Sequence, residues 1–229
     1  LAPWMFEGTS IEKIELPAGI KTIPTSAFNN CARLSSIAIP ESVVSIGSYA
    51  FSGCKSLRSV SLPPDLKNIS SLAFSESGLR EVVLPESLRE IGMSAFSSCT
   101  DMKSVTVNGD LDGFGGYAFR NTTGIQAIHV RTTVPPTFSI DLHPFDNIDT
   151  ETCTLFVPKG GTVTYRSDVQ WGCFKNIVEE TATSIDNVTA TVGKTSEKVY
   201  DVNGRLLPQR MKGLNIIRTS DGKVKKIYY

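Results

Sequence analysis

The sequence predicts a solenoid, a coil of similar turns that stack around one continuous apolar core. The pair Ala-Phe recurs along the first half of the chain, and successive Phe residues are 22 or 23 positions apart. A period of this length is typical of repeat architectures, in which each repeat buries its apolar face only against its neighbours. The recurring residues are Phe6 (preceded by Met5), Phe28, Phe51, Phe74, Phe96 and Phe119.

Each repeat continues with a short strand that begins five or six residues after its Phe. The motif reads Leu-x-x-Val-x-Leu-Pro in residues 57–63 and 79–85, and related segments follow the other Phe residues. Alternating β-branched and Leu residues favour a strand, and Pro ends it because Pro cannot donate to a continuing ladder. A second apolar pair, such as Leu66 and Ile69, precedes the next Ala-Phe.

A single repeat cannot fold alone. Ordering its backbone costs on the order of 1 to 2 kcal/mol per residue, whereas each large apolar side chain returns only about 1.5 to 3 kcal/mol on burial. Stacking is therefore obligatory. Strands lie roughly 4.8 Å apart, so six of them give a sheet about 25 Å across, a surface suited to a macromolecule more than to a metabolite.

These repeats resemble the BspA-type leucine-rich repeat of secreted and surface proteins. Its consensus, A-F-x-x-C-x-x-L-x-x-V-x-L-P-x-x-L-x-x-I-G, is matched by AFSGCKSLRSVSLPPDLKNIS in residues 50–70. The resemblance implies a right-handed, curved leucine-rich repeat solenoid, with a parallel sheet on its concave side and short irregular or helical turns elsewhere. We predict six repeats over residues 1–131, the first one truncated. We also expect further residues upstream, because Leu1 falls inside a repeat.

Residues 132–180 are predicted to cap the solenoid. The period breaks at Thr132, and the stretch that follows resembles the closing segment of BspA-type proteins, a strand ending in Val-Pro-Lys-Gly and then a helix with aromatic residues. Such residues would shield the open end of the core from water. They would be Tyr165, Trp171 and Phe174 here, so we interpret Trp171 as a cap residue rather than a ligand platform.

Residues 181–229 are predicted to form a small all-β domain, similar to a β-sandwich. Asn203-Gly204 and Asp221-Gly222 are strong signals for tight hairpins. Together with the Val-Tyr-Asp-x-x-Gly-Arg pattern and the basic terminal strand, they resemble the C-terminal sorting domain of the type IX secretion pathway. The resemblance implies export of the chain.

Charge and hydropathy exclude two classes of function. The chain has 23 basic and 23 acidic residues. Residues 1–180 hold 14 basic and 19 acidic residues, a net of −5, and residues 181–229 hold 9 and 4, a net of +5. Such modest charges argue against nucleic acid as the main partner. No apolar run approaches the roughly 20 residues of a transmembrane segment.

The five cysteines cannot all pair within the chain, because their number is odd. Cys31, Cys54 and Cys99 each stand three residues after a Phe, a shared position that favours free, buried thiols. A bridge between Cys31 and Cys54 stays open, since adjacent repeats come within disulfide range. A bridge between Cys153 and Cys173 stays open as well.

No catalytic motif is present, and we predict no catalytic residue, metal or cofactor. The chain lacks a G-x-S-x-G elbow, an H-E-x-x-H pair and a phosphate-binding G-x-x-x-x-G-K loop. His143 lies near Asp141, Asp146 and Asp149, a set that could bind a metal. A solvated acidic turn is the preferred interpretation. The other histidine, His129, is expected at a surface position of the last strand.

Because no catalytic motif is present, we look for a binding function on the surface of the solenoid. One register position just before the strands holds Arg58, Arg80 and Lys103 in successive repeats, a basic stripe suited to an acidic protein segment or glycan. The ordinary alternative is a solvated strand edge. The outward strand positions beside the stripe hold small polar residues, and we include three in the candidate site: Ser59, Ser61 and Thr106.

These inferences predict a non-enzymatic protein, secreted or displayed on the outer cell surface, that attaches to a host or neighbouring cell. Its partner would be an extracellular protein or glycan, and the protein would be a monomer. Adhesion is what the BspA-type resemblance implies, since spacing and composition indicate only the scaffold. The alternatives are a cell-envelope spacer that presents an upstream domain and, third, a metal-dependent enzyme using the loop 141–149.

Overall fold

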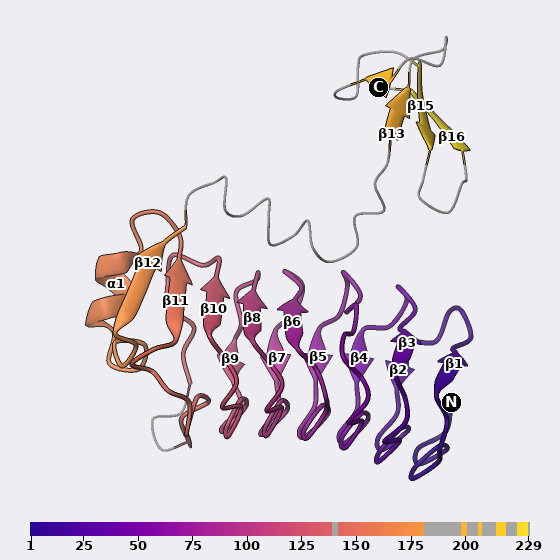
Figure 1. The fold of residues 1–229 in the computed structure, drawn as a ribbon, viewed down its shortest axis with the longest axis horizontal. Helices are drawn as coiled ribbons and strands as arrows, with labels where there is room; N and C mark the ends of the chain where they lie inside the picture. Colours follow the sequence, from indigo (N-terminus) through magenta and orange to yellow (C-terminus); the bar gives the residue numbers. More distant parts are fainter. Residues whose placement is uncertain (139–141, 181–197, 201–205, 208–213, 219–223, 229) are drawn as a thin grey trace. The chain divides into compact units, whose positions relative to one another are not determined.

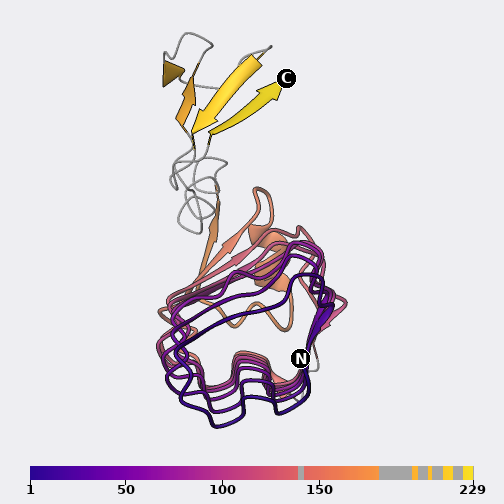
Figure 2. The ribbon, with the colours of Figure 1, turned by 90° about the vertical axis from the view of Figure 1, so that its right-hand side faces the viewer.

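The first part of the chain is a parallel-sheet solenoid, as predicted. The computed structural model describes residues 1–138, 142–180, 198–200, 206–207, 214–218 and 224–228. These belong to two compact units, Leu1–Thr181 and Ala182–Tyr229. In the first unit the turns stand in a row (Figure 1) and nearly superimpose when viewed along that row (Figure 2).

One side of the solenoid carries parallel strands, which we call the first sheet. Two strands pair separately from the other five, which follow the order β12-β11-β10-β8-β6. Inward residues share one register, so that Val82 lies beside Val105 and Val105 beside Ile128. The separate pair is β1 (Lys13–Glu15) and β3 (Ser36–Ala38); the others are β6 (Glu81–Leu84), β8 (Ser104–Val107), β10 (Ala127–Val130), β11 (Thr154–Val157) and β12 (Asn176–Glu179).

The first sheet is interrupted at the third repeat, where we predicted a strand. Residues 57–62 form no strand, although the Arg80 N–H still donates to the Arg58 carbonyl at 3.0 Å and keeps the register. Val60 and Leu62 are only half-buried, whereas Val82 and Leu84 in the next repeat are buried. This repeat also differs in having a second proline, Pro64, after the strand-ending one.

A second parallel sheet forms in the part of each repeat where the resemblance implied short irregular or helical turns. The second apolar pair of each repeat contributes a two-residue strand whose Ile or Phe points into the core. Backbone bonds such as Lys67 N–H to the Val44 carbonyl, 2.8 Å, hold these strands together. They are β2 (Thr22–Ile23), β4 (Ser45–Ile46), β5 (Asn68–Ile69), β7 (Glu90–Ile91) and β9 (Gly113–Phe114).

The core is a column of stacked Phe rings. Neighbouring centroids from Phe6 to Phe119 are 5.1 to 5.4 Å apart, and the rings are nearly parallel. The Ala residues that precede the rings of turns two to six are fully buried as well. Phe145 extends the column, stacking on Phe119 at 5.6 Å. We number the turns one to seven by these rings.

The stacking continues beyond residue 131, where we expected the repeats to end. Strand β11 pairs in parallel with β10, and β12 pairs with β11. Between Phe119 and Phe145 the step is 26 residues, which concealed the seventh turn from a search at a fixed period. The last ring of the column is covered by buried aromatic residues of the predicted cap: Tyr165, Trp171 and Phe174. The ring centroids of Trp171 and Phe145 are 5.3 Å apart. The helix α1 (Thr162–Ser167) carries Tyr165.

Each turn bends sharply on both sides of its Phe. The residue two positions before Phe has a positive φ in turns one to six, with values of 53 to 59°. The residue two positions after Phe also has a positive φ, in all seven turns. The second series holds mostly Gly and Asn, which tolerate this conformation, whereas the first holds Trp4, Tyr49, Leu72 and Tyr117.

The second unit contains a four-stranded antiparallel sheet in the order β14-β13-β15-β16. Its strands are β13 (Lys198–Tyr200), β14 (Leu206–Leu207), β15 (Leu214–Arg218) and β16 (Val224–Tyr228). The pairing of β15 with β16 brings Arg218 opposite Val224. The predicted hairpin turns at Asn203-Gly204 and Asp221-Gly222 lie outside the described residues.

Candidate functional site: a basic stripe beside the first sheet

Backbone hydrogen bonds hold the basic stripe in register. The Arg80 N–H donates to the Arg58 carbonyl at 3.0 Å, and the Lys103 N–H donates to the Arg80 carbonyl at 2.6 Å. The three residues are exposed and occupy the same position in turns three, four and five. Their Cα atoms are therefore about one strand spacing, roughly 4.8 Å, apart from turn to turn.

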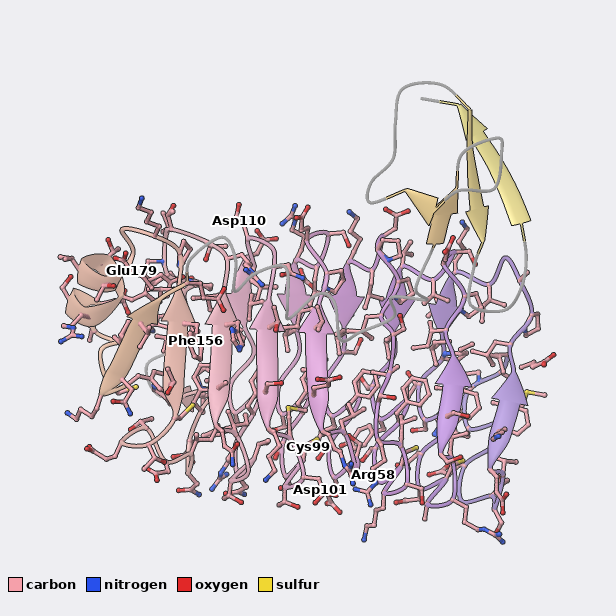
Figure 3. The ribbon with its side chains drawn as sticks, turned by 45° about the horizontal axis from the view of Figure 1, so that its top comes forward. Arg58, Cys99, Asp101, Asp110, Phe156 and Glu179 are labelled. Carbon is pink, nitrogen blue, oxygen red and sulfur yellow. The ribbon has the colours of Figure 1, made fainter. Side chains whose placement is uncertain are left out.

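The three basic residues differ in their partners. Arg58 forms an ion pair with Asp101 of turn five, and its guanidinium also donates to the Gly78 carbonyl at 3.4 Å. Figure 3 shows Arg58 and Asp101 side by side at the edge of the solenoid. Within residues 1–138 and 142–180, neither Arg80 nor Lys103 has an ion-pair partner.

The small residues predicted beside the stripe are not equally accessible. Ser59 and Ser61 are exposed, in the interrupted third repeat. Thr106 is only 2% exposed, so it cannot contact a ligand in this conformation, contrary to our expectation. It lies on β8 between Val83 and His129 of the neighbouring strands, and His129 is itself buried.

His129 belongs to a buried charged cluster that the sequence did not reveal. We expected it at the surface, but it is 8% exposed. Its Nδ1 contacts one carboxylate oxygen of Glu180, and Arg131 donates to the other at 2.9 Å. Glu180 follows β12, two strands away from the β10 residue His129. No local pattern in the sequence brings residues 129 and 180 together.

The imidazole of His129 also stacks on Phe156 of β11, with ring centroids 4.5 Å apart. Phe156 in turn lies in register with the half-exposed Val178 of β12. The outward positions are therefore small in turns two and three (Ser36, Ala38, Ser59 and Ser61) but aromatic and apolar near the C-terminal end. Phe156 and Val178 lie beyond residue 131, where the repeat period of the sequence has already broken.

The loop considered as an alternative metal site makes contacts within the protein. The Phe145 N–H donates to His143 Nδ1 at 3.2 Å, while Nε2 lies 3.4 Å from the Gln170 carbonyl. Asp146 pairs with Arg120, and Asp149 accepts three hydrogen bonds from residues 151 and 152. Asp141 lies outside the described residues. Within the described part of the chain, no group of three His, Cys, Asp or Glu side chains is arranged to hold a metal.

The cysteines are unbridged, and their chemistry is suppressed by burial. Desolvation raises the pKa of Cys54 to about 12, that of Cys99 to about 11 and that of Cys153 to about 12. Such thiols are protonated at neutral pH, and the thiolate is the nucleophilic form. The arrangement therefore favours a structural role for these three residues over nucleophilic catalysis.

The comparisons with known proteins identify the repeat. Residues 21–149, more than half of the chain, match the family described as the BspA type leucine rich repeat region, in six copies. The chain belongs to this family. No curated protein matches the sequence.

Two solved structures of other bacterial proteins share the fold. The pneumococcal vaccine antigen PcpA is 21% identical, with a TM-score of 0.56 over 75% of this chain and 42% of its own. A leucine-rich repeat protein of T. pallidum is 24% identical, with a TM-score of 0.51 over 80% of this chain and 84% of its own. This BspA-type chain thus spans about two fifths of the length of the pneumococcal protein.

Among the residues that the structure describes, none forms a helix with the length and apolar character that crossing a bilayer requires.

Proposed function

We propose that the solenoid is a non-enzymatic binding module, secreted or displayed on a bacterial surface, that attaches to an extracellular protein or glycan. The contact surface is the basic stripe of Arg58, Arg80 and Lys103, with Ser59 and Ser61 beside it. Membership of the BspA-type family and the likeness in fold to a pneumococcal antigen support this function.

The observation that carries the proposal is the alignment of three exposed cations on consecutive turns. Backbone bonds fix their spacing, so an extended acidic segment lying along the solenoid would meet all three at once. Arranged charge of one sign accelerates encounter with a partner of the opposite sign. The few small side chains around the stripe leave room for a macromolecule to approach.

The proposed function excludes Thr106, which is buried, and makes no use of the loop 141–149. The contacts of His143, Asp146 and Asp149 within the protein favour binding over metal-dependent catalysis. Protonated, buried thiols favour the same conclusion.

We assign export to the C-terminal unit, Ala182–Tyr229, as part of the same proposal. Its antiparallel strands and its terminal basic strand are compatible with a type IX sorting domain. The experiment is deletion of residues 182–229 in a host that has this pathway. Loss of the protein from the cell surface and medium, with retention inside the cell envelope, supports the assignment, and unchanged export contradicts it.

The test of binding is a screen of the purified monomer against extracellular proteins and glycans, at low and physiological salt. The proposal predicts at least one ligand whose binding weakens as salt rises, because exposed charges are screened. A variant with Arg58, Arg80 and Lys103 all changed to Ser serves as the matched control. If no ligand distinguishes the two proteins, the spacer function replaces the binding function.

A further inference from the structure

A recess opens beside Arg58 because turn four is short. The link between Phe74 and its strand segment is one residue shorter than the links of turns three and five. Ser77 occupies the position that holds Cys54 in turn three, and its N–H donates to the Phe74 carbonyl as the Cys54 N–H does to Phe51. The chain then passes directly to Gly78, so the surface of turn four is lower than its neighbours here.

Gly78 is required at this point. A Cβ on it would lie 2.2 Å from the Lys55 carbonyl oxygen, closer than any side chain tolerates. Turn four therefore presents bare backbone between the side chains of turns three and five. The resulting recess has a volume of about 490 Å³ and is lined by Lys55, Arg58, Glu76, Ser77, Gly78, Ser98, Thr100 and Asp101. We call it the Gly78 recess.

The ion pair of Arg58 with Asp101 spans this recess. The two residues belong to turns three and five, so their side chains meet above turn four. The two other exposed ion pairs within the described residues, Arg33 with Glu12 and Arg120 with Asp146, connect adjacent turns. The Arg58 guanidinium therefore has contacts with two other turns. It donates to the Gly78 carbonyl of turn four and pairs with the Asp101 carboxylate of turn five.

The pair is accessible and weak. The side chains of Arg58 and Asp101 are 48% and 52% exposed, and ion pairs in such positions contribute little to stability because water screens them. The recess holds two cations, Lys55 and Arg58, and two anions, Glu76 and Asp101. Removal of Asp101 alone would leave it with a net positive charge, on the side where Arg80 and Lys103 continue the basic stripe.

We propose that the Gly78 recess is a carboxylate-binding subsite, which Asp101 occupies in the free protein as an internal substitute for the ligand. An Asp or Glu side chain of an acidic partner displaces Asp101, pairs with Arg58 and gains the charge of Lys55. The inference rests on the proposed function, since it names the ligand chemistry at one end of the basic stripe.

The need to displace Asp101 makes the site selective for acidic partners over neutral ones. A partner must supply a carboxylate that binds Arg58 more favourably than Asp101 does, and a neutral surface cannot do so. The guanidinium suits this exchange because its planar array of N–H donors matches a carboxylate. Ser98 and Thr100 add hydroxyl donors around the entering group.

The experiment titrates hexaglutamate peptide into the full chain and follows the Arg58 Nε–H signal by NMR and the heat by calorimetry. Asp101→Asn removes the internal carboxylate and should tighten binding by about threefold to tenfold, the gain expected from deleting an exposed competitor. Arg58→Gln should weaken binding below that of the wild type. The double variant should behave as Arg58→Gln, because the gain depends on a free Arg58.

Asp112→Asn is the matched control. It deletes the same charge from an exposed residue that directly precedes β9 and is not part of the recess lining. An equal gain in this control, or in the double variant, would attribute the effect to net charge and overturn the subsite. No gain in Asp101→Asn would also overturn it. If Arg80→Ser and Lys103→Ser still weakened binding, the stripe would stand without the recess.

Discussion

At the scale of single residues, the third position after Phe has a role beyond filling space in turns two, three, five and six. There its thiol or hydroxyl donates a hydrogen bond to the Phe carbonyl of the preceding turn, as Cys54 does to Phe28 at 3.2 Å. The position therefore selects a small side chain that is both tolerant of burial and able to donate. The four donors are Cys31, Cys54, Cys99 and Thr122.

This contact predicts the reactivity of the thiols. At pH 8 the raised pKa values of Cys54, Cys99 and Cys153 keep them protonated, and burial excludes reagents. Labelling with a thiol reagent should be slow in buffer, and denaturant without reductant should add at least three reactive groups. Equal labelling in both conditions would show that these thiols are accessible in the folded protein, which would contradict their buried positions.

The strained residues before each Phe make a second prediction at this scale. Ser94 is held at a φ of 54°, a conformation that costs an L-residue roughly 1 to 2 kcal/mol and costs Gly nothing. Replacing Ser94 with Gly removes this cost, but part of the resulting gain in stability is offset by the greater freedom of Gly in the unfolded chain. Ser94→Gly should therefore raise the free energy of unfolding by about 0.5 to 1 kcal/mol in urea melts.

Ser45→Gly, in strand β4, is the matched control for Ser94→Gly. It carries only the entropic cost and should destabilise the protein. If both changes destabilise, the turn is not strained at Ser94.

At the scale of elements, the sequence could predict the Phe column and most strands of the first sheet because their residues recur in register. It could not predict the gap at residues 57–62, whose Leu-x-x-Val-x-Leu pattern is as regular as that of β6. Pairing depends on backbone geometry in both neighbours, which periodicity alone does not report. The second sheet was missed because a two-residue strand is too short to show an alternation of apolar and polar residues.

The Phe column yields a prediction for one element. Phe74 is fully buried between Phe51 and Phe96, with centroids 5.1 and 5.2 Å away. Phe74→Ala should lower the free energy of unfolding by about 3 to 5 kcal/mol, as truncation of a core aromatic residue does. The exposed Ser61→Ala should change it hardly at all. Equally small effects in urea melts would mean that the repeats are misaligned.

At the scale of the whole molecule, the extent of the stack depends on contacts far apart in sequence. Phe145 joins the column after an irregular 26-residue step, and Glu180 returns to His129 and Arg131 across β11. The basic stripe could be found from register alone, since the repeats place it at one position. The Arg58 to Asp101 pair could not, because it skips a turn whose shortness matters only in three dimensions.

The central claim is that this solenoid binds its partner through the basic stripe. The most direct test measures association of the ligand identified by the screen with the wild type and with the variant carrying Ser at positions 58, 80 and 103. Binding to the variant should be roughly tenfold to a hundredfold weaker, mainly through slower association, and the difference should shrink as salt rises. An unchanged association rate at low salt would contradict the claim and leave the stripe an ordinary solvated edge.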